Sequence, residues 1–499
     1  MAAFGLFVDL GGRLLWGDEA ETACLARNIT TYGVPRADDG RNRITLLDGK
    51  DLNEGGIWTW SPWLDEYVVA GSFLAFGVSA TTARLPFALV GLVSVLLLMR
   101  LAREVYCSQR VALTAGIFLA SCVPFLLHAR QSRYHSLLVV AEIGILNGFA
   151  LLLARRWGRG ALLVAVCLAV QCHSNYTVAP AAAGGVLLAS VLLARKWGAR
   201  LPLSASGGVV GGVLLFLPWF LYARPDAQAS SLTLELASGK MLYLLDAVQQ
   251  HVLPLVILIL PLLAWPYRRS QRAETGFRLT ERGRGVTVLL ACLLVAHLAL
   301  FAVLPFVYFR YLVPILPVIL LLGAVCLTSF LRTSWLQSAV VGFLCLSNLL
   351  SVLTGFWLPG SREVEIPYPR YLGSLLRDYR DPLYVVVEYL RENGSPDETV
   401  YVDDPEFPII FHTSMRVIDG RFHRIDREAL PDWILSESPS AADAPRKLSL
   451  PPAMEPLYET IRLAVPATRR GASRPDPEVW QPRTAKETAE LVVYRRRSR

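Results

Sequence analysis

Two adjacent carboxylates near the start of the chain are the residues best suited to chemistry. Asp18 and Glu19 stand in the sequence Trp-Gly-Asp-Glu-Ala-Glu-Thr at 16–22, between two apolar stretches. A carboxylate there can accept the proton of an attacking hydroxyl, and burial or a nearby guanidinium tunes its pKa. A helix cap is the structural alternative, because Asp18 and Glu21 have capping-box spacing. We interpret Asp18 as a candidate general base and Glu19 as its assistant or a substrate ligand.

Three arginines form a second group of candidates. The sequence His-Ala-Arg-Gln-Ser-Arg-Tyr-His at 128–135 holds Arg130, Arg133 and Tyr134, and Arg310 interrupts the apolar stretch 286–331. A guanidinium binds phosphate through a bidentate fork, and neutralising a departing phosphate assists its departure. Ordinary lipid headgroups are the alternative partners. We predict that these arginines bind a phosphate, with Tyr134 as a further substrate contact and Arg133 close to Asp18.

Tryptophans and acids are interleaved between residues 51 and 66. Trp58, like Trp60 and Trp63, offers a ring that can stack on a sugar, although such rings also form interfacial belts in membrane proteins. Asp65 is predicted to hold sugar hydroxyls or a divalent cation, with a solvated loop charge as the alternative. The residue types do not decide whether these carboxylates bind a metal or act alone.

The elements that must position these residues are membrane helices. Of 499 residues, 53% are hydrophobic and only 18% are charged. Uncharged runs of about 20 residues are long enough to cross a bilayer. We predict a polytopic α-helical membrane protein with about 10–11 transmembrane helices and a C-terminal soluble α/β domain. The complete spans are expected near 82–103, 110–128, 136–154, 160–173, 175–194, 202–223, 242–266, 286–308, 311–331 and 336–357.

The charge pattern excludes a nucleic-acid partner and orients the chain. The net charge is +8, but the excess Lys and Arg lie in loops between the apolar runs. One set of loops holds 16 Lys and Arg and the alternating set only five, so the basic set is predicted to be cytoplasmic. The segment 16–81 and the tail then face the opposite side. Eight cysteines without a CxxC pair support neither a disulfide framework nor a zinc site.

Four regions follow from this pattern. Residues 1–15 are expected to form a partial first transmembrane helix, with the true start upstream of Met1. Residues 16–81 are expected to be an extracytoplasmic catalytic loop with interfacial helices, 82–357 a transmembrane bundle, and 358–499 an extracytoplasmic α/β domain. In that last domain we predict a helix at Pro382–Glu392 and a loop near 466–484. Strands are predicted at Thr399–Val402, Pro408–Phe411, Arg416–Ile418, Trp433–Leu435 and Leu491–Tyr494.

The order of these motifs resembles the GT-C glycosyltransferases, in the branch of protein O-mannosyltransferases and lipid A aminoarabinose transferases. The matching pieces, over residues 9–357 and more loosely the tail, are Asp-Glu-Ala at 18–20, Ala-Arg at 26–27, Tyr-Gly-x-Pro at 32–35, Ala-Arg-Leu-Pro at 83–86, Ser-Arg-Tyr at 132–134 and Arg-Tyr-Leu-Val-Pro at 310–314. The resemblance implies a polyprenyl-phosphate sugar donor, inversion at the anomeric carbon, Asp18 as base, and Arg130, Arg133 and Arg310 on the phosphate. It also implies that the C-terminal domain aids acceptor binding.

The function predicted from the sequence is therefore an integral-membrane glycosyltransferase of the inner (plasma) membrane. It would transfer a hexose or pentose to a glycan, lipid or protein on the extracytoplasmic face. The alternative is a transporter or flippase of a lipid-linked sugar with an outer regulatory domain. Broken helices and inverted repeats would favour this alternative. An anchor whose tail alone binds glycans is the third reading.

Overall fold

The structure is a computed structural model. It describes residues 1–225, 237–263, 279–305, 307–331, 333–359, 363–404, 406–425, 429–439, 448–468 and 473–497. Most of the predicted basic loop at 268–284, Arg332, and the end of the predicted span 242–266 lie outside these residues.

The chain divides into two compact units. The first, here called the helical unit, comprises Met1–Phe7, Phe87–Arg130 and Tyr134–Leu372. The second, the sheet unit, comprises Val8–Pro86, Gln131–Arg133 and Gly373–Arg499. The segment 16–81 therefore shares a unit with the C-terminal tail.

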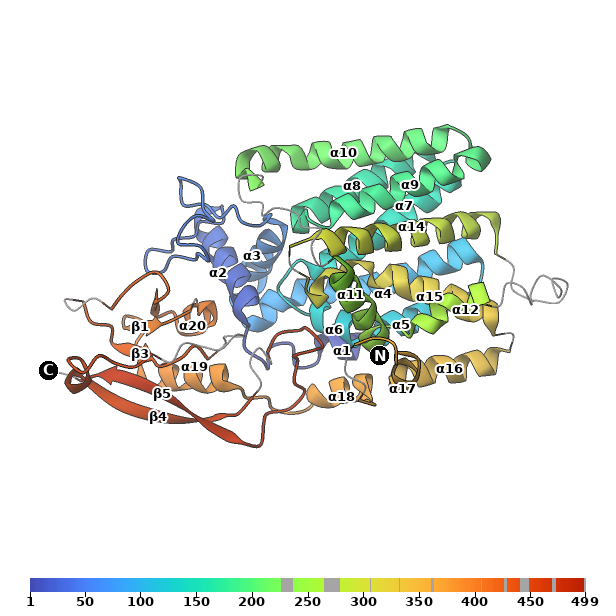
Figure 1. The fold of residues 1–499 in the computed structure, drawn as a ribbon. Coiled ribbons are helices and arrows are strands. Elements are labelled where there is room, and N and C mark those ends of the chain that lie inside the picture. The colour runs from blue at the N-terminus through green and yellow to red at the C-terminus, as the bar shows by residue number, and fades with distance from the viewer. Residues whose placement is uncertain are drawn as a thin grey trace. The chain divides into compact units, whose positions relative to one another are not determined.

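Helices make up the described part of the helical unit (Figure 1). Their bounds are α1 Ala2–Phe7, α4 Ala80–Tyr106 (which begins in the sheet unit), α5 Gln109–Ser121, α6 Val123–Ala129, α7 His135–Leu153, α8 Trp157–Asn175, α9 Ala179–Trp197, α10 Arg200–Ala223, α11 Ala237–His251, α12 Leu255–Leu263, α14 Glu281–Val303, the 3-10 helix η2 Phe309–Ile315, α15 Leu316–Phe330, α16 Ser334–Leu346, α17 Leu349–Thr354 and α18 Pro367–Ser374.

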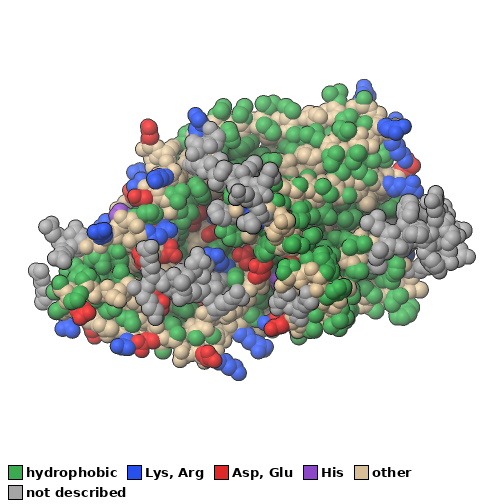
Figure 2. All heavy atoms as spheres, viewed as in Figure 1, with side chains coloured by type: hydrophobic (Ala, Val, Ile, Leu, Met, Phe, Trp, Pro, Cys, Tyr) green, Lys and Arg blue, Asp and Glu red, His purple; other side chains and the backbone are tan. Residues whose placement is uncertain are grey.

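Among the described residues, six helices are long and apolar enough to cross a membrane, or seven if α5 and α6 form one span. Several predicted spans are broken, which lowers the count from the expected 10–11. The span 110–128 bends by 63° between α5 and α6, and 242–266 and 336–357 each contain two shorter helices. Pro254 lies in the break before α12, where a missing backbone N–H cannot continue a helix. Hydrophobic side chains cover the face of α10 seen in Figure 2.

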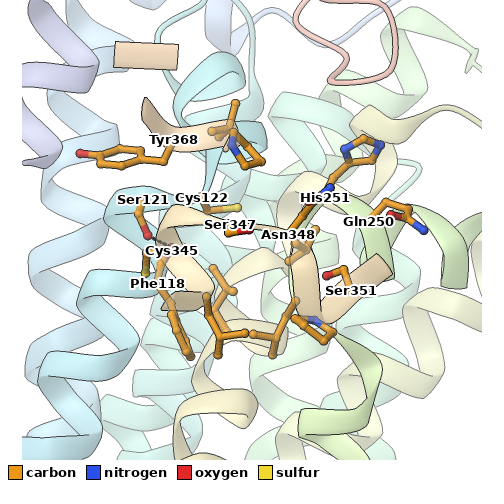
Figure 3. A pocket seen from close by; sticks show the side chains of 17 residues that line it. Phe118, Ser121, Cys122, Gln250, His251, Cys345, Ser347, Asn348, Ser351 and Tyr368 are labelled. Atoms are coloured by element: carbon orange, nitrogen blue, oxygen red, sulfur yellow. Dashed lines mark hydrogen bonds between the residues drawn. The ribbon is translucent and has the colours of Figure 1, made fainter. Parts of the chain in front are cut away.

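The three helix breaks line one small cavity of about 60 Å³ (Figure 3). Cys122 comes from the first break, Val252 to Pro254 from the second, and Ser347 with Asn348 from the third. The side chain of Gln249 compensates for the interrupted backbone here. It donates to Ser351 O at 2.6 Å and accepts from Leu255 N at 2.7 Å. Unwound backbone inside a bundle is tolerated where protein groups satisfy it in this way.

The sheet unit holds a five-stranded mixed sheet in the order β2-β1-β3-β5-β4. The β2, β1 and β3 strands run parallel, whereas β5 pairs antiparallel with both β3 and β4. Helix α19 contributes Val386, Val387 and Leu390 to a core that also contains Trp433. The elements of this unit are α2 Gly17–Tyr32, α3 Leu64–Phe76, α19 Pro382–Asn393, β1 Thr399–Val402, α20 Phe407–Thr413, β2 Arg416–Asp419, β3 Trp433–Leu435, η3 Glu455–Leu457, β4 Tyr458–Pro466 and β5 Thr488–Arg496.

The predicted helix at 382–392 and four of the five predicted strands are confirmed within a residue or a few. The predicted strand Pro408–Phe411 is wrong, because this run lies inside α20. A short apolar run does not distinguish a strand from a buried helix, and proline suits the first turn of a helix. Strand β4 was missed. It forms a long ladder with β5.

Candidate active site

Helix α2 positions the acidic motif, and its N-terminus is not capped by a side chain. Trp16 is the N-cap residue and makes no side-chain cap hydrogen bond, so Asp18 lies within the first turn of the helix. The helix ends at Gly33, whose φ of 77° places it in the left-handed region that glycine adopts without strain. The capping-box interpretation of Asp18 and Glu21 is therefore wrong. Glu21 instead accepts from Arg133, and Asp18 lies beside the same guanidinium.

Glu19 is the centre of a closed ion pair. Arg84 Nε donates to Glu19 Oε1 at 2.8 Å and Arg84 Nη2 to Oε2 at 2.6 Å. The backbone N–H of Ser132 donates to the same Oε1 at 3.0 Å. Because its side chain is only 1% exposed and both oxygens are engaged, Glu19 is placed to hold the chain together rather than to meet a substrate. The prediction that it assists catalysis directly is not supported by this geometry.

Arg84 also ties down the segment that precedes α2. Its guanidinium donates to three backbone carbonyls, those of Leu10, Arg13 and Leu14. Together with Glu19 these acceptors surround the planar guanidinium of Arg84, whose N–H groups can donate to several oxygens at once. Ser132 is fixed by Glu19 as well, through its Oγ on Glu19 O at 3.3 Å. The pair thus positions the residue directly before Arg133.

Arg133 meets the other two acids of α2. Its Nη1 donates to Glu21 Oε1 at 2.9 Å and to Thr22 Oγ1 at 3.0 Å. Its Nη2 lies 3.5 Å from Asp18 Oδ2. The Asp18 side chain is 31% exposed, whereas that of Glu21 is 4% exposed. This arrangement leaves one carboxylate accessible beside a guanidinium that a buried acid orients.

Burial raises the pKa of Glu21 from its ordinary 4.5 to about 7. The negative charges of Asp18 and Asp51 add to this effect, and the charge of Arg133 offsets part of it. A carboxyl group with a pKa near neutrality beside a guanidinium is typical of functional sites, although structural networks also shift pKa values.

Asp51 in the loop and both acids of α3 are buried. Asp51 accepts hydrogen bonds from Thr45 Oγ1 at 2.5 Å and Leu46 N at 2.6 Å, which fold its own loop. Asp65 and Glu66 are buried at the start of α3, and burial together with the charge of Asp65 raises the pKa of Glu66 well above its ordinary value. Asp65 therefore does not present an accessible carboxylate to a sugar. Among the described residues, no group of three His, Cys, Asp or Glu side chains is placed to hold a metal ion.

The tryptophans differ in exposure. Trp58 is 0% exposed, with its Nε1 donating to Ser61 Oγ at 2.9 Å, so the prediction that this ring stacks on a sugar is contradicted. Its backbone carbonyl accepts from Trp63 Nε1 at 2.7 Å, and both rings support the loop. Trp60 is 38% exposed and is the most exposed of the three, while Trp63 is half-buried.

The remaining predicted site residues belong to the helical unit. Arg130 Nη1 donates to Gly5 O at 3.3 Å and to Tyr371 Oη at 3.2 Å. The Tyr134 ring lies 4.6 Å from that of His135. The Arg310 guanidinium lies over the Tyr308 ring at 4.8 Å. The structure thus brings Asp18, Glu19 and Arg133 together in the sheet unit, and it places Arg130, Tyr134 and Arg310 in the other unit.

Four residues of this site were not singled out from the sequence: Glu21, Thr22, Arg84 and Ser132. Arg84 and Ser132 stand inside motifs that carried the family resemblance, which was their only signal. Glu21 entered the sequence analysis only through the alternative of a capping box, because its spacing from Asp18 fits that local role.

Comparison with known proteins agrees with this architecture. A model of the dolichyl-phosphate-mannose-protein mannosyltransferase family matches residues 61–222, less than half of the chain. No curated protein matches the sequence. Among solved structures, ArnT from Cupriavidus metallidurans bound to undecaprenyl phosphate is similar with a TM-score of 0.58 and 17% identity, over 99% of this chain and 96% of that one. The same enzyme in the apo state gives 0.58 and 18%, over 98% and 95%.

At this identity the likeness establishes the fold. It covers both the helical and the sheet unit, and so it confirms the expected fold class of a multi-pass helical membrane protein with a C-terminal α/β domain. The chain has the fold of ArnT, and its motifs resemble those of the GT-C membrane glycosyltransferases.

Proposed function

We propose that this chain is an integral-membrane glycosyltransferase that moves one sugar, a hexose or pentose, from a polyprenyl-phosphate carrier to an extracytoplasmic acceptor. The fold and the family match support the transferase class. The likeness to an ArnT solved with undecaprenyl phosphate supports this kind of donor. The acceptor is a hydroxyl or similar nucleophile of a glycan, a lipid or a protein.

The observation that carries the proposal is the part of the α2 site that a substrate can reach, the Asp18 carboxylate beside Arg133. The Asp18 carboxylate is accessible and lies 3.5 Å from the Arg133 guanidinium. A base for the incoming hydroxyl and a cation for the departing phosphate are the two groups that sugar transfer from a phosphate requires.

The reaction is a single displacement. Asp18 takes the proton of the acceptor hydroxyl as its oxygen bonds to the anomeric carbon. The bond from that carbon to the phosphate oxygen breaks on the opposite face, so the configuration inverts. Polyprenyl phosphate leaves with the electron pair, and Arg133 stabilises the charge that develops on it.

Other residues have supporting roles in the proposal. Glu19 and Arg84 fix the start of α2 and the loop with Ser132, because their contacts are saturated. Glu21 orients Arg133 from the buried side. Arg130, Tyr134 and Arg310 are proposed contacts of the carrier in the helical unit, where a guanidinium over an aromatic ring can still bind a phosphate.

The proposed location is the inner (plasma) membrane with Asp18 and the C-terminal domain on the extracytoplasmic face. The excess of Lys and Arg in one set of loops supports this orientation. A cysteine introduced at Lys50, an exposed loop residue, should react with a membrane-impermeant maleimide in intact cells. Labelling only after lysis would show that residue 50 faces the cytoplasm, and it would refute the proposed extracytoplasmic site.

The test of the transferase uses the full chain in lipid nanodiscs with a radiolabelled polyprenyl-phosphate sugar. Replacing Asp18 with Asn should lower transfer by about 10²–10⁴-fold, the usual contribution of a general base. Asp397→Asn is the matched control, because this exposed acid pairs with Arg41 away from Arg133. Full activity in Asp18→Asn would refute the mechanism. Mass spectrometry of lipids and glycans from a deletion strain would identify the sugar and the acceptor.

A transporter or flippase of a lipid-linked sugar is the second candidate, and one observation favours it. Three helix breaks meet at one cavity in the helical unit, as expected for helices that rearrange around a cargo. This candidate predicts movement of the lipid-linked sugar across liposomes without transfer, and it predicts that Asp18→Asn leaves the movement intact. The transferase predicts the opposite pair of results.

A further inference from the structure

The sheet unit contains a large cleft separate from the contacts of Arg133. Its volume is about 1040 Å³, and the described residues that line it come mainly from loop 38–48, from strand β2, and from 422–425 and 429–432. The polar lining residues on which the argument depends are Arg43, Arg416, Arg424, Asp419, Asp432 and Tyr401. A cleft of this size can take a ligand of several sugar rings, within the range of protein binding sites.

The walls of the cleft are fixed by internal hydrogen bonds. Asn42 is buried and pairs with the edge of β2 as a further strand would, donating to Met415 O at 3.1 Å and accepting from Val417 N at 2.8 Å. On the other side, Tyr401 Oη donates to His423 O at 3.0 Å. The loop and the sheet are thus joined without a ligand, and the cleft is preformed.

Most acids of the lining are already engaged within the protein. Asp432 Oδ2 accepts from Thr399 N at 2.9 Å and from Thr399 Oγ1 at 3.0 Å. Asp419 binds Arg421 with its closest contact at 2.8 Å. Glu406 is buried and accepts from Ser438 Oγ. These carboxylates are therefore poorly placed to bind a cationic ligand.

The arginines of the lining are in the opposite situation. Arg43, Arg416 and Arg424 are exposed, and within the described part of the chain none of them forms an ion pair. Among the described lining residues, two acids, Asp38 and Asp48, are likewise exposed without an ion pair, and Asp38 already accepts a hydrogen bond from Gly40 N at 2.7 Å. The Arg43 guanidinium lies against Gly49, where a Cβ would come within 2.6 Å of Nη2 and the φ of +85° also requires glycine. The uncommitted charge of the cleft is positive.

We propose that this cleft binds an anionic saccharide, through carboxylate or phosphate groups on its sugars. A guanidinium recognises either group with a bidentate fork. The exposed ring of Phe422 in the same lining suits the apolar face of a sugar. That this saccharide is the acceptor rests on the proposed function, whereas its binding does not. Binding and transfer can therefore be tested separately.

The binding test uses the full chain in nanodiscs and calorimetry with two charged probes. A galacturonic acid pentamer carries carboxylates, and a phosphorylated mannose pentasaccharide carries a phosphate. Their neutral counterparts are the methyl-esterified pentamer and the unphosphorylated pentasaccharide. We expect one charged probe to bind about tenfold or more tightly than its counterpart, the usual gain from a charge-assisted pair. Which probe binds identifies the anion. Equal affinity for charged and neutral probes would overturn the proposal.

Variants locate the binding. Arg43→Gln and Arg416→Gln should each weaken binding of the charged probe by about tenfold, and the double variant by more. Arg483→Gln is the control, because it removes the same charge from an exposed arginine that does not line the cleft. An equal loss in the control would show that net charge alone attracts the probe, and it would overturn the site.

The two proposals fail in different ways. Asp18→Asn should bind the charged probe as the unmodified chain does. If the unmodified chain binds the probe but transfers no sugar, the proposed transferase activity is refuted and the proposed saccharide site is supported. If the unmodified chain transfers sugar while Arg43→Gln and Arg416→Gln bind the probe normally, the proposed saccharide site is refuted and the proposed transferase activity is supported.

Discussion

Helix α2 carries two acid–guanidinium arrangements within one turn, and they are built differently. The pair of Glu19 with Arg84 is closed, since both side chains are nearly inaccessible and both carboxylate oxygens are engaged. The arrangement of Arg133 with Asp18 and Glu21 is half open, with Glu21 buried and Asp18 partly exposed. The closed pair serves the fold, and the half-open one leaves a carboxylate for chemistry.

The difference follows from how each charge is compensated. A buried ion pair is stable only when further hydrogen bonds satisfy the rest of its polar atoms. Arg84 meets this condition with three backbone carbonyls besides Glu19. Arg133 compensates its acids less completely, because burial still raises the pKa of Glu21 to about 7. The second arrangement is therefore sensitive to pH near neutrality.

The largest expected effect comes from opening the closed pair. Replacing Arg84 with Met leaves Glu19 buried without its partner and three carbonyls without a donor. Removing one partner of a buried pair typically costs about 3–5 kcal/mol. We expect a large fall in the thermal unfolding midpoint in detergent, with little folded protein recovered. Arg462→Met, on the exposed Glu490 pair, should leave the midpoint unchanged. A stable Arg84→Met variant would show that this pair does not hold the fold.

Changing Arg133 tests the half-open arrangement, where activity is expected to fall while the stability of the fold is retained. Lysine keeps the charge but loses the fork that holds two oxygens at once. We expect Arg133→Lys to remain folded while kcat/KM for a polyprenyl-phosphate sugar falls on the order of 10- to 100-fold. Steady-state kinetics beside a thermal unfolding scan separates the two effects. Equal losses of stability in Arg133→Lys and Arg84→Met would remove the contrast between the arrangements.

The sequence predicted the partners of the open arrangement but not the closed one. Asp18 and Arg133 were expected to share a site because both are charged residues at the ends of apolar runs, and they lie 3.5 Å apart. Glu19, Trp58 and Asp65 are of the right types, yet all three are buried. The accessibility of a residue depends on which distant segments pack over it. The type of the residue and its spacing from its neighbours do not predict that packing.

The fold shows the same limit at the level of elements. The apolar runs predicted where helices lie, because length and hydropathy decide membrane insertion. They did not predict the breaks near Cys122, His251 and Ser347, where side chains such as Gln249 replace lost backbone hydrogen bonds. In the sheet unit, the run 408–411 became a helix by tertiary packing, which short local patterns do not encode.

A smaller effect is expected from the titration of Glu21. Its folded pKa of about 7 exceeds its ordinary 4.5, so between these values the folded chain keeps a proton that the unfolded chain has lost. Stability should therefore fall as pH rises from 4.5 to 7 and level off above, by up to about 3 kcal/mol. Glu21→Gln should reduce this slope in unfolding midpoints measured across pH, and the raised pKa of Glu66 should account for slope that remains. Glu490→Gln, on an exposed acid, should keep it. An unchanged slope in Glu21→Gln would assign the titration to another group.

The smallest effect that separates the two arrangements lies in a single hydroxyl. Thr22 Oγ accepts from Arg133 Nη1 at 3.0 Å and donates to Asp18 O at 3.2 Å, so it joins the guanidinium to the turn that carries the base. Thr22→Val keeps the shape and loses both bonds, each with a net value of about 0.5–1.5 kcal/mol. Because Glu21 still holds Arg133, we expect KM for the donor to rise about threefold to tenfold with kcat nearly unchanged. Thr30→Val is the control on the same helix, since its hydroxyl bonds only to Arg27 O. A fall in kcat as large as that of Asp18→Asn would mean that Thr22 itself takes part in the proton transfer.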